Sequence, residues 1–148
     1  MAADSTSLEF FFRLSRAYST LTRRLDNSLG SFHGLSFADY MLLSSLGRAP
    51  GTRLRRVDLA ERLGLTASGV TRALIPLEKI GLVKRQPDPR DARIGYAVLT
   101  PAGAKLLASA TESAAMVSDV ALQAVPARQL EAFSTLLGQL AGINATNA

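Results

Sequence analysis

The sequence contains no cysteine and only one histidine, His33. Without cysteine it can form no disulfide, no cysteine-ligated zinc or iron–sulfur site and no thiol redox sensor, which is typical of a cytoplasmic protein. One histidine cannot supply a pair of metal ligands or a histidine-based catalytic triad, and no glycine-rich nucleotide fingerprint occurs. We therefore expect no bound metal, no cofactor and no enzymatic activity.

Long apolar runs and a basic leader are also lacking. The longest apolar run, residues 8–12, is interrupted by Glu9 and is far too short to span a bilayer. The N-terminus lacks the basic start of a signal peptide. With 148 residues, of which 47% are hydrophobic and 20% charged, a single folded domain without membrane contact is expected.

Positive charge is abundant, and it is concentrated in one segment. Residues 48–93 contain 11 Lys or Arg against 5 Asp or Glu, a net charge of +6. The rest of the chain contains 6 basic and 7 acidic residues, a net charge of −1. This placement favours a polyanionic partner, and binding to such a partner should weaken steeply as salt rises.

Within the basic segment, residues 57–84 predict two short helices joined by a tight turn. Gly64 ends the first helix, Thr66 is placed to cap the second, and Gly81 ends the second. Each helix has an apolar stripe at helical spacing: Val57, Leu59, Ala60 and Leu63 in the first, and Val70, Ala73, Leu74, Leu77 and Ile80 in the second.

The other face of the second helix carries small, hydroxylic and basic side chains, namely Ala67, Ser68, Thr71, Arg72 and Lys79. Small residues allow close approach to the major groove, hydroxyls can bond bases or phosphates, and an arginine can bind guanine through two hydrogen bonds. The pattern therefore favours a helix that reads DNA. The alternative is an ordinary helical hairpin with a solvated face.

A basic β-ribbon is predicted directly after these helices. Residues 82–83 begin one strand, residues 96–99 resume an extended pattern, and the turn-rich loop from Pro87 to Gly95 joins them. Arg90 and Arg93 would lie at the tip, where a guanidinium can enter a narrow minor groove. Asp88 and Asp91 are expected to pair with arginines and hold the loop. Residues 54–56 predict a third strand beside the ribbon.

Apolar helices flank this basic centre. We expect helices at residues 8–27, 37–46 and 101–124, a break at residues 30–34, and a last helix opened by Pro126. Ser36 and Asp39 match a capping box. The apolar faces near both chain ends predict a homodimer, and the alternative is an intramolecular hairpin in a monomer.

Two segments resemble the MarR family of winged helix-turn-helix transcription regulators. These are LSFADYMLLSSL (35–46) and residues 58–103, which include Thr71-Arg72, Leu77-Glu78, Gly81-Leu82-Val83, the wing pattern D-P-x-D-x-R from Asp88 to Arg93, and the L-T-x-x-G run from Leu99 to Gly103. Ala92 stands where many members carry a second wing arginine, and Gly95 loosens the returning strand; both bear on the strength of wing contacts.

The resemblance implies a mainly α fold with a small β-wing (α+β). A single domain, 1–148, would comprise a winged helix-turn-helix core at 36–100 and dimerisation helices at 8–30 and 101–143. It implies a homodimeric repressor of a palindromic double-stranded DNA site. The expected DNA-binding residues are Ala67, Ser68, Thr71, Arg72, Arg90, Arg93, Arg53, Arg55 and Lys84, with Arg56, Lys79 and Arg85 adding to the field that attracts phosphates.

Family members often respond to small aromatic or anionic compounds, so the resemblance also implies an effector pocket beside the dimerisation helices. Its candidate residues are Phe12, Arg16, Tyr18, His33, Tyr40 and Met41, each of which could instead be a packing or surface residue. Two alternatives to a specific regulator remain open: a protein-interaction module that docks an acidic partner, and an architectural binder without sequence preference.

Overall fold

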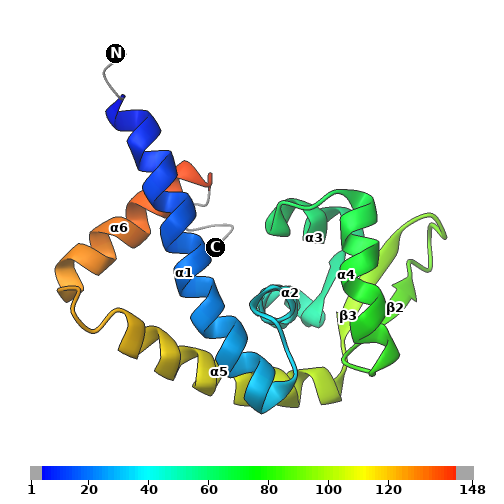
Figure 1. Cartoon of the computed structure of the whole chain (residues 1–148). Coiled ribbons are helices and arrows are strands. Elements are labelled where there is room, and N and C mark those ends of the chain that lie inside the picture. Colours follow the sequence, from blue (N-terminus) through cyan, green and yellow to red (C-terminus); the bar gives the residue numbers. More distant parts are fainter. Residues whose placement is uncertain (1–4, 143–148) are drawn as a thin grey trace. The chain divides into compact units, whose positions relative to one another are not determined.

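Helices make up most of the structure, and three short strands form a small sheet (Figure 1). A computed structural model describes residues 5–142. The elements are α1 (Thr6–His33), α2 (Phe37–Arg48), β1 (Arg53–Arg55), α3 (Arg56–Leu63), α4 (Ala67–Lys79), β2 (Val83–Pro87), β3 (Gly95–Leu99), α5 (Pro101–Ala121) and α6 (Ala127–Leu140). The predicted mainly helical fold with a β-wing is confirmed.

The described residues up to Val117 form one compact unit, and those from Ser118 form a second. In the first unit, α2 contacts α1 on one side and α3 on the other (Figure 1). The outermost parts of the predicted domain, residues 1–4 and 143–148, lie outside the described residues. None of the helices between residues 5 and 142 has the length and apolar character to cross a membrane.

Helix α1 is longer than the sequence suggested. The break expected from Gly30 onward was wrong, because Gly30 keeps helical geometry and the helix ends only at His33. Gly34 then takes the left-handed conformation, with φ of +68°, and its N–H donates to the carbonyl of Gly30 at 3.2 Å. A glycine adopts this conformation without steric cost, which explains why the helix stops there.

The caps of the central helices follow the sequence. The capping box is confirmed: the Ser36 hydroxyl accepts from the Asp39 N–H, and the Asp39 carboxylate accepts from the Ser36 N–H, both at 3.0 Å. Thr66 caps α4 by accepting from the N–H of Gly69 at 3.1 Å. Gly64 ends α3, as predicted. Helix α2 continues to Arg48, two residues beyond the predicted end.

Two residues assigned to the buried stripes are exposed instead. Val57 is 67% exposed because it lies in the first turn of α3 on the side away from Leu59, which is fully buried. Ile80 is 63% exposed because it follows the last residue of α4, where the chain leaves the helix ahead of Gly81. The core-facing stripes are therefore shorter than predicted.

The sheet is antiparallel, with strand order β1-β3-β2. Arg53 pairs with Val98 and Arg55 with Tyr96 across β1 and β3, while β2 and β3 form the ribbon. The predicted third strand is confirmed, shifted by one residue to Arg53–Arg55 because Arg56 already starts α3. Burial alternates along β1, which is half-buried only at its central Leu54.

The core of the first unit is mostly leucine. Leu29 of α1, Leu42, Leu43 and Leu46 of α2, Leu59 of α3 and Leu74 of α4 are each no more than 1% exposed. Ala110 and Ala114 of α5 complete this core with small side chains that allow close packing. Helix α5 ends at Ala121 rather than near residue 124.

One junction links the ribbon to α5. The Thr100 hydroxyl donates to the carbonyls of Gly81 at 2.6 Å and Leu82 at 3.0 Å, and it accepts from the Gly103 N–H at 3.0 Å. The Thr100 N–H also donates to the Leu82 carbonyl. Gly103 packs so closely that a Cβ there would overlap the Leu82 carbonyl and lie 2.7 Å from Leu99 Cδ1. The junction therefore requires glycine at 103.

We predict opposite effects for alanine at two helical glycines. Gly103→Ala should lower the free energy of unfolding by about 1–3 kcal/mol, because the added methyl group must displace backbone. Gly30→Ala is the matched control, since its Cβ would meet nothing closer than the Leu35 carbonyl at 3.9 Å. It should raise stability by roughly 0.5–1 kcal/mol through helix propensity. Urea denaturation monitored by circular dichroism measures both, and a Gly103→Ala protein as stable as wild type would contradict the junction.

Candidate nucleic-acid interface

Helix α4 has one buried face and one exposed face. Val70, Leu74 and Leu77 are at most 2% exposed and attach the helix to the core. The opposite face presents Ser68, Arg72 and Lys79 to solvent. The prediction that small, hydroxylic and basic side chains point outward from α4 is therefore confirmed for these positions and for Ala67. A helix exposed in this way can approach a partner along its whole outer face.

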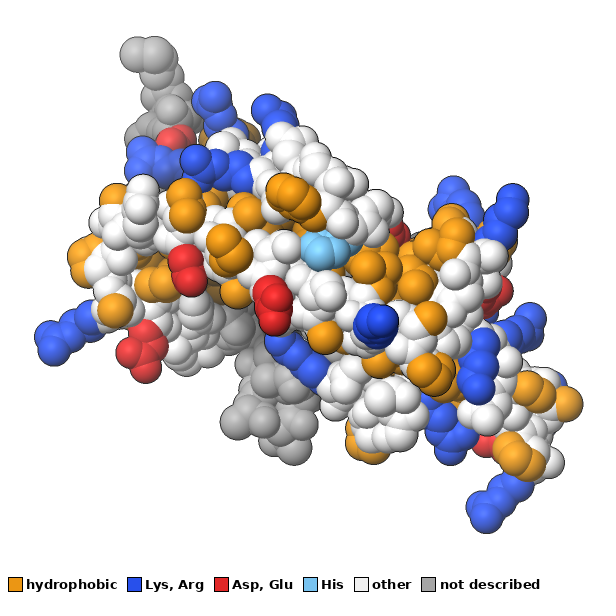
Figure 2. Space-filling model, turned by 90° about the horizontal axis from the view of Figure 1, so that it is seen from below, with side chains coloured by type: hydrophobic (Ala, Val, Ile, Leu, Met, Phe, Trp, Pro, Cys, Tyr) orange, Lys and Arg blue, Asp and Glu red, His pale blue; other side chains and the backbone are white. Residues whose placement is uncertain are grey.

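Five basic side chains on α4 and the ribbon have no side-chain partner among residues 5–142. They are exposed and make no ion pair or side-chain hydrogen bond within residues 5–142; we call them the free cations: Arg72, Lys79, Lys84, Arg85 and Arg90. Figure 2 shows Lys and Arg side chains projecting at the end of the view where the ribbon lies. Unpaired cations keep their full charge for an external anion.

Arg56 was predicted to add to the charge that attracts phosphates, but its side chain contacts two residues of α4 instead. Its Nη2 donates to the Thr71 hydroxyl at 2.7 Å, and its Nη1 lies 3.9 Å from the Glu78 carboxylate. The Arg56 side chain is only 22% exposed and passes Gly95 of β3. Thr71 also donates to the Ala67 carbonyl at 3.2 Å. The Thr71 hydroxyl thus uses its single donor and one of its two acceptor positions inside the protein.

The two arginines of β1 are also held by the protein. Arg53 lies over the Tyr96 ring, 4.3 Å from its centroid, and donates to Gln86 at 3.0 Å. Arg55 donates to Asp58 at 2.9 and 3.4 Å, and this hydrogen bond raises the pKa of Arg55 above its usual value. These contacts fix the orientation of Arg53 and Arg55, both of which the sequence analysis predicted to bind DNA.

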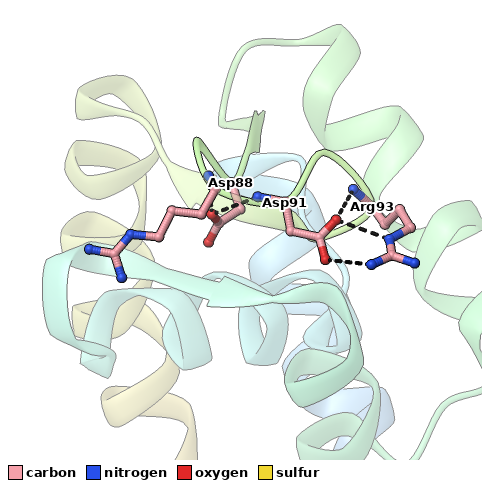
Figure 3. Close-up of polar contacts among 4 residues, drawn as sticks. Asp88, Asp91 and Arg93 are labelled. Carbon is pink, nitrogen blue, oxygen red and sulfur yellow. Dashed lines mark hydrogen bonds and ion pairs between the residues drawn. The ribbon is translucent and has the colours of Figure 1, made fainter.

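Two aspartates shape the ribbon loop. The Asp91 carboxylate accepts from Arg93 Nε at 3.1 Å and Nη2 at 3.2 Å (Figure 3), so the predicted pairing is confirmed for Asp91. This hydrogen bond lowers the pKa of Asp91. For Asp88 the prediction was wrong: its carboxylate accepts from the backbone N–H groups of Arg90 and Asp91 and from the Tyr96 hydroxyl. A carboxylate so close to loop N–H groups is satisfied without an arginine.

The six residues proposed for an effector pocket do not gather within one chain. Phe12 and His33 lie on the same helix, and at ~1.5 Å per residue they are roughly 30 Å apart. Phe12 and Tyr18 are 56% and 62% exposed, Arg16 is exposed, and Met41 is 38% exposed.

Only His33 and Tyr40 converge on a common element. His33 Nε2 lies 2.7 Å from the Ser113 hydroxyl, and the Tyr40 hydroxyl donates to Thr111 at 3.1 Å. Both partners belong to α5, so these two bonds tie the end of α1 and the start of α2 to that helix. Figure 2 shows hydrophobic side chains around the histidine on this face.

The structural roles of Arg56, Tyr96 and Thr100 were not predicted from the sequence. Each makes its contact with a residue at least 8 positions away in the chain, such as Arg56 with Thr71 and Thr100 with Gly81. Residue spacing carries no signal for such tertiary bonds. One further feature, the outward position of Ile75 on α4, was visible from helical periodicity alone.

Comparison with known proteins agrees with this geometry. A family model described as MarR family matches residues 33–94, which span α2 to the ribbon loop. The transcriptional regulator MhqR of Bacillus subtilis is 25% identical over 139 residues, covering 94% of this chain and 93% of MhqR.

Solved structures extend the likeness to the flanking helices. Sco3205, a MarR family transcriptional regulator from Streptomyces coelicolor solved in complex with DNA, is 26% identical with a TM-score of 0.85, covering 95% of this chain and 89% of that one. The transcriptional regulator BldR from Sulfolobus solfataricus is 28% identical with a TM-score of 0.80, covering 94% and 99%. The helix-turn-helix, the ribbon and the flanking helices thus all have counterparts in transcriptional regulators, and the chain is similar to the MarR family in sequence over residues 33–94 and in fold over nearly its whole length.

Proposed function

We propose that this transcriptional regulator binds a palindromic duplex site as a homodimer and represses transcription there, in the cytoplasm. Helix α4 of each subunit lies in the major groove, with Ser68 and Arg72 at the base edges. The ribbon loop carries Arg90 and Arg93 toward the minor groove. The two half-sites are centred ~10 bp apart, one turn of the duplex.

The observation that carries this proposal is the division of the basic side chains into two groups. Arg53, Arg55 and Arg56 are held by partners within the protein and set the shape of the surface. On α4 and the ribbon, the two elements that would enter the grooves, five of the six basic side chains are free cations, and only Arg93 is paired. Charge that folding leaves unpaired on these elements is available to phosphates and bases.

The dimer is supported by apolar side chains that the chain leaves uncovered. On α1, Phe11 and Tyr18 are 63% and 62% exposed; on α6, Phe133 and Leu140 are 57% and 62% exposed. Helical faces with this much exposed apolar area favour burial against a second copy of the chain. Two-fold symmetry then presents two copies of α4 to the two halves of a palindrome.

A small aromatic or anionic effector forms a second part of the proposal. His33 and Tyr40 are the strongest of the six candidates. Their hydrogen bonds to Ser113 and Thr111 connect α5 to the end of α1 and to the start of α2. An effector can release DNA only by binding more tightly to a dimer whose two α4 helices no longer match the half-sites.

The test is binding to duplex DNA across a salt series. Duplexes selected by the protein from its source genome should bind more tightly than scrambled ones, and light scattering should give a dimer mass. Each phosphate contact should contribute about −0.9 to the slope of log K against log salt. A slope without sequence preference would indicate an architectural binder. Indifference to every duplex at low salt, with binding to an acidic protein instead, would indicate an interaction module.

Arg72→Ala tests base reading by α4. Removing an arginine that binds a base edge should cost about 1–3 kcal/mol of binding free energy and relax preference at one position per half-site. Lys79→Ala on the same face is the matched control, expected to weaken all duplexes evenly. Fluorescence anisotropy on a panel of single-base variants measures both. If Arg72→Ala also weakened every duplex evenly, Arg72 would be a phosphate contact.

The ribbon arginines should differ in importance. Arg90→Ala should reduce affinity and lower the salt slope by about 1, whereas Arg93→Ala should have a smaller effect because Asp91 already neutralises that guanidinium. Arg13→Ala, an arginine paired with Glu9 on α1, serves as the control and should leave affinity unchanged. The dimer mass should stay the same in all three. Equal affinity of Arg90→Ala and wild type would show that the ribbon does not contact DNA.

A further inference from the structure

Ile75 lies in the middle of the outward face of α4. Ser68, Arg72, Ile75 and Lys79 are spaced by 4, 3 and 4 residues and therefore form one line along the helix. Ile75 is 54% exposed, whereas Leu74 and Leu77 on the opposite face are at most 2% exposed. An isoleucine thus stands where the pattern of the face calls for a polar or basic side chain.

The surroundings of Ile75 limit what can cover it. Apart from Pro76 beside it, the exposed residues of α4 are small, hydroxylic or basic. A protein partner that docks by apolar contact needs a larger patch than one isoleucine. The free cations Arg72 and Lys79, one helical turn away on either side, favour a partner that is strongly anionic yet offers one small apolar group.

Duplex DNA offers such a combination in its major groove. Thymine presents a 5-methyl group at the base edge, and this is the apolar group by which side chains distinguish it from cytosine. Ile75 lies 7 residues after Ser68, roughly 10 Å along the helix. With ~3.4 Å between successive base pairs, a helix that follows the groove places Ile75 about three base pairs from the one that faces Ser68.

We propose that Ile75 reads the 5-methyl group of a thymine in each half-site. The inference rests on the proposed function and adds a specificity-determining residue to it. Arg72 and Ser68 act through hydrogen bonds, whereas Ile75 acts by removing a methyl group and its own side chain from water. The thymine lies on the side of the half-site that faces the C-terminal half of α4.

The experiment removes the methyl group and nothing else. Duplexes enriched by the full-length protein from a random library supply a consensus, in which deoxyuridine replaces thymine at one position of each half-site at a time. Anisotropy titrations at fixed salt measure affinity. For wild type, one substituted position should weaken binding roughly fourfold per half-site, the effect of about one buried methyl group. Ile75→Ala should bind the thymine and deoxyuridine duplexes equally.

Ile80→Ala is the matched control, because Ile80 is 63% exposed but lies beyond the end of α4. It should keep the wild-type loss on deoxyuridine, and thermal melting should show all variants folded. A consensus without thymine in this region, no loss on deoxyuridine, or the same loss in Ile75→Ala would each overturn the role of Ile75 alone. A library that yields no enriched sequence would overturn the proposed function together with it.

Discussion

Attachment of α4 by a single apolar face is the constraint on which the rest of the structure depends. Val70, Leu74 and Leu77 enter the leucine core, so the side chains on the opposite face cannot turn inward without exposing that core. Burial of three such residues is worth several kcal/mol, at about 1.5–3 kcal/mol each. The core thus fixes which side of α4 meets solvent, and the charged surface follows from that choice.

Around α4, the basic residues serve two purposes that their sequence does not distinguish. Arg56 spans two turns of α4 through Thr71 and Glu78, and Arg53 stacks on Tyr96 across the sheet. These contacts hold α4 and the ribbon in a defined relation before any partner arrives. Preorganisation of this kind reduces the ordering that association would otherwise require. Some arginines of this surface therefore stabilise the protein itself, and the free cations remain available to DNA.

Local signals in the sequence predicted the elements well and their tertiary partners poorly. The cap at Thr66, the capping box at Ser36 and the stripe of α4 up to Leu77 depend on neighbours three or four positions away, and these features appear in the structure. The break at Gly30 was wrong because a glycine in open space is compatible with a helix; of the two glycines in the expected break, only Gly34 has a positive φ. The partners of Arg53 and Arg56 come from other elements. The effector candidates do not gather within one chain because four of them lie along the single long helix α1.

The Thr100 junction has a mechanical consequence. The Leu82 carbonyl accepts from both the N–H and the hydroxyl of Thr100, and Gly103 packs closely against the same peptide group. The start of α5 is therefore held tightly against the start of β2. Leu82 follows the end of α4 by only three residues. A shift of α5 at this junction would therefore reach the C-terminal end of α4 through only three residues of chain.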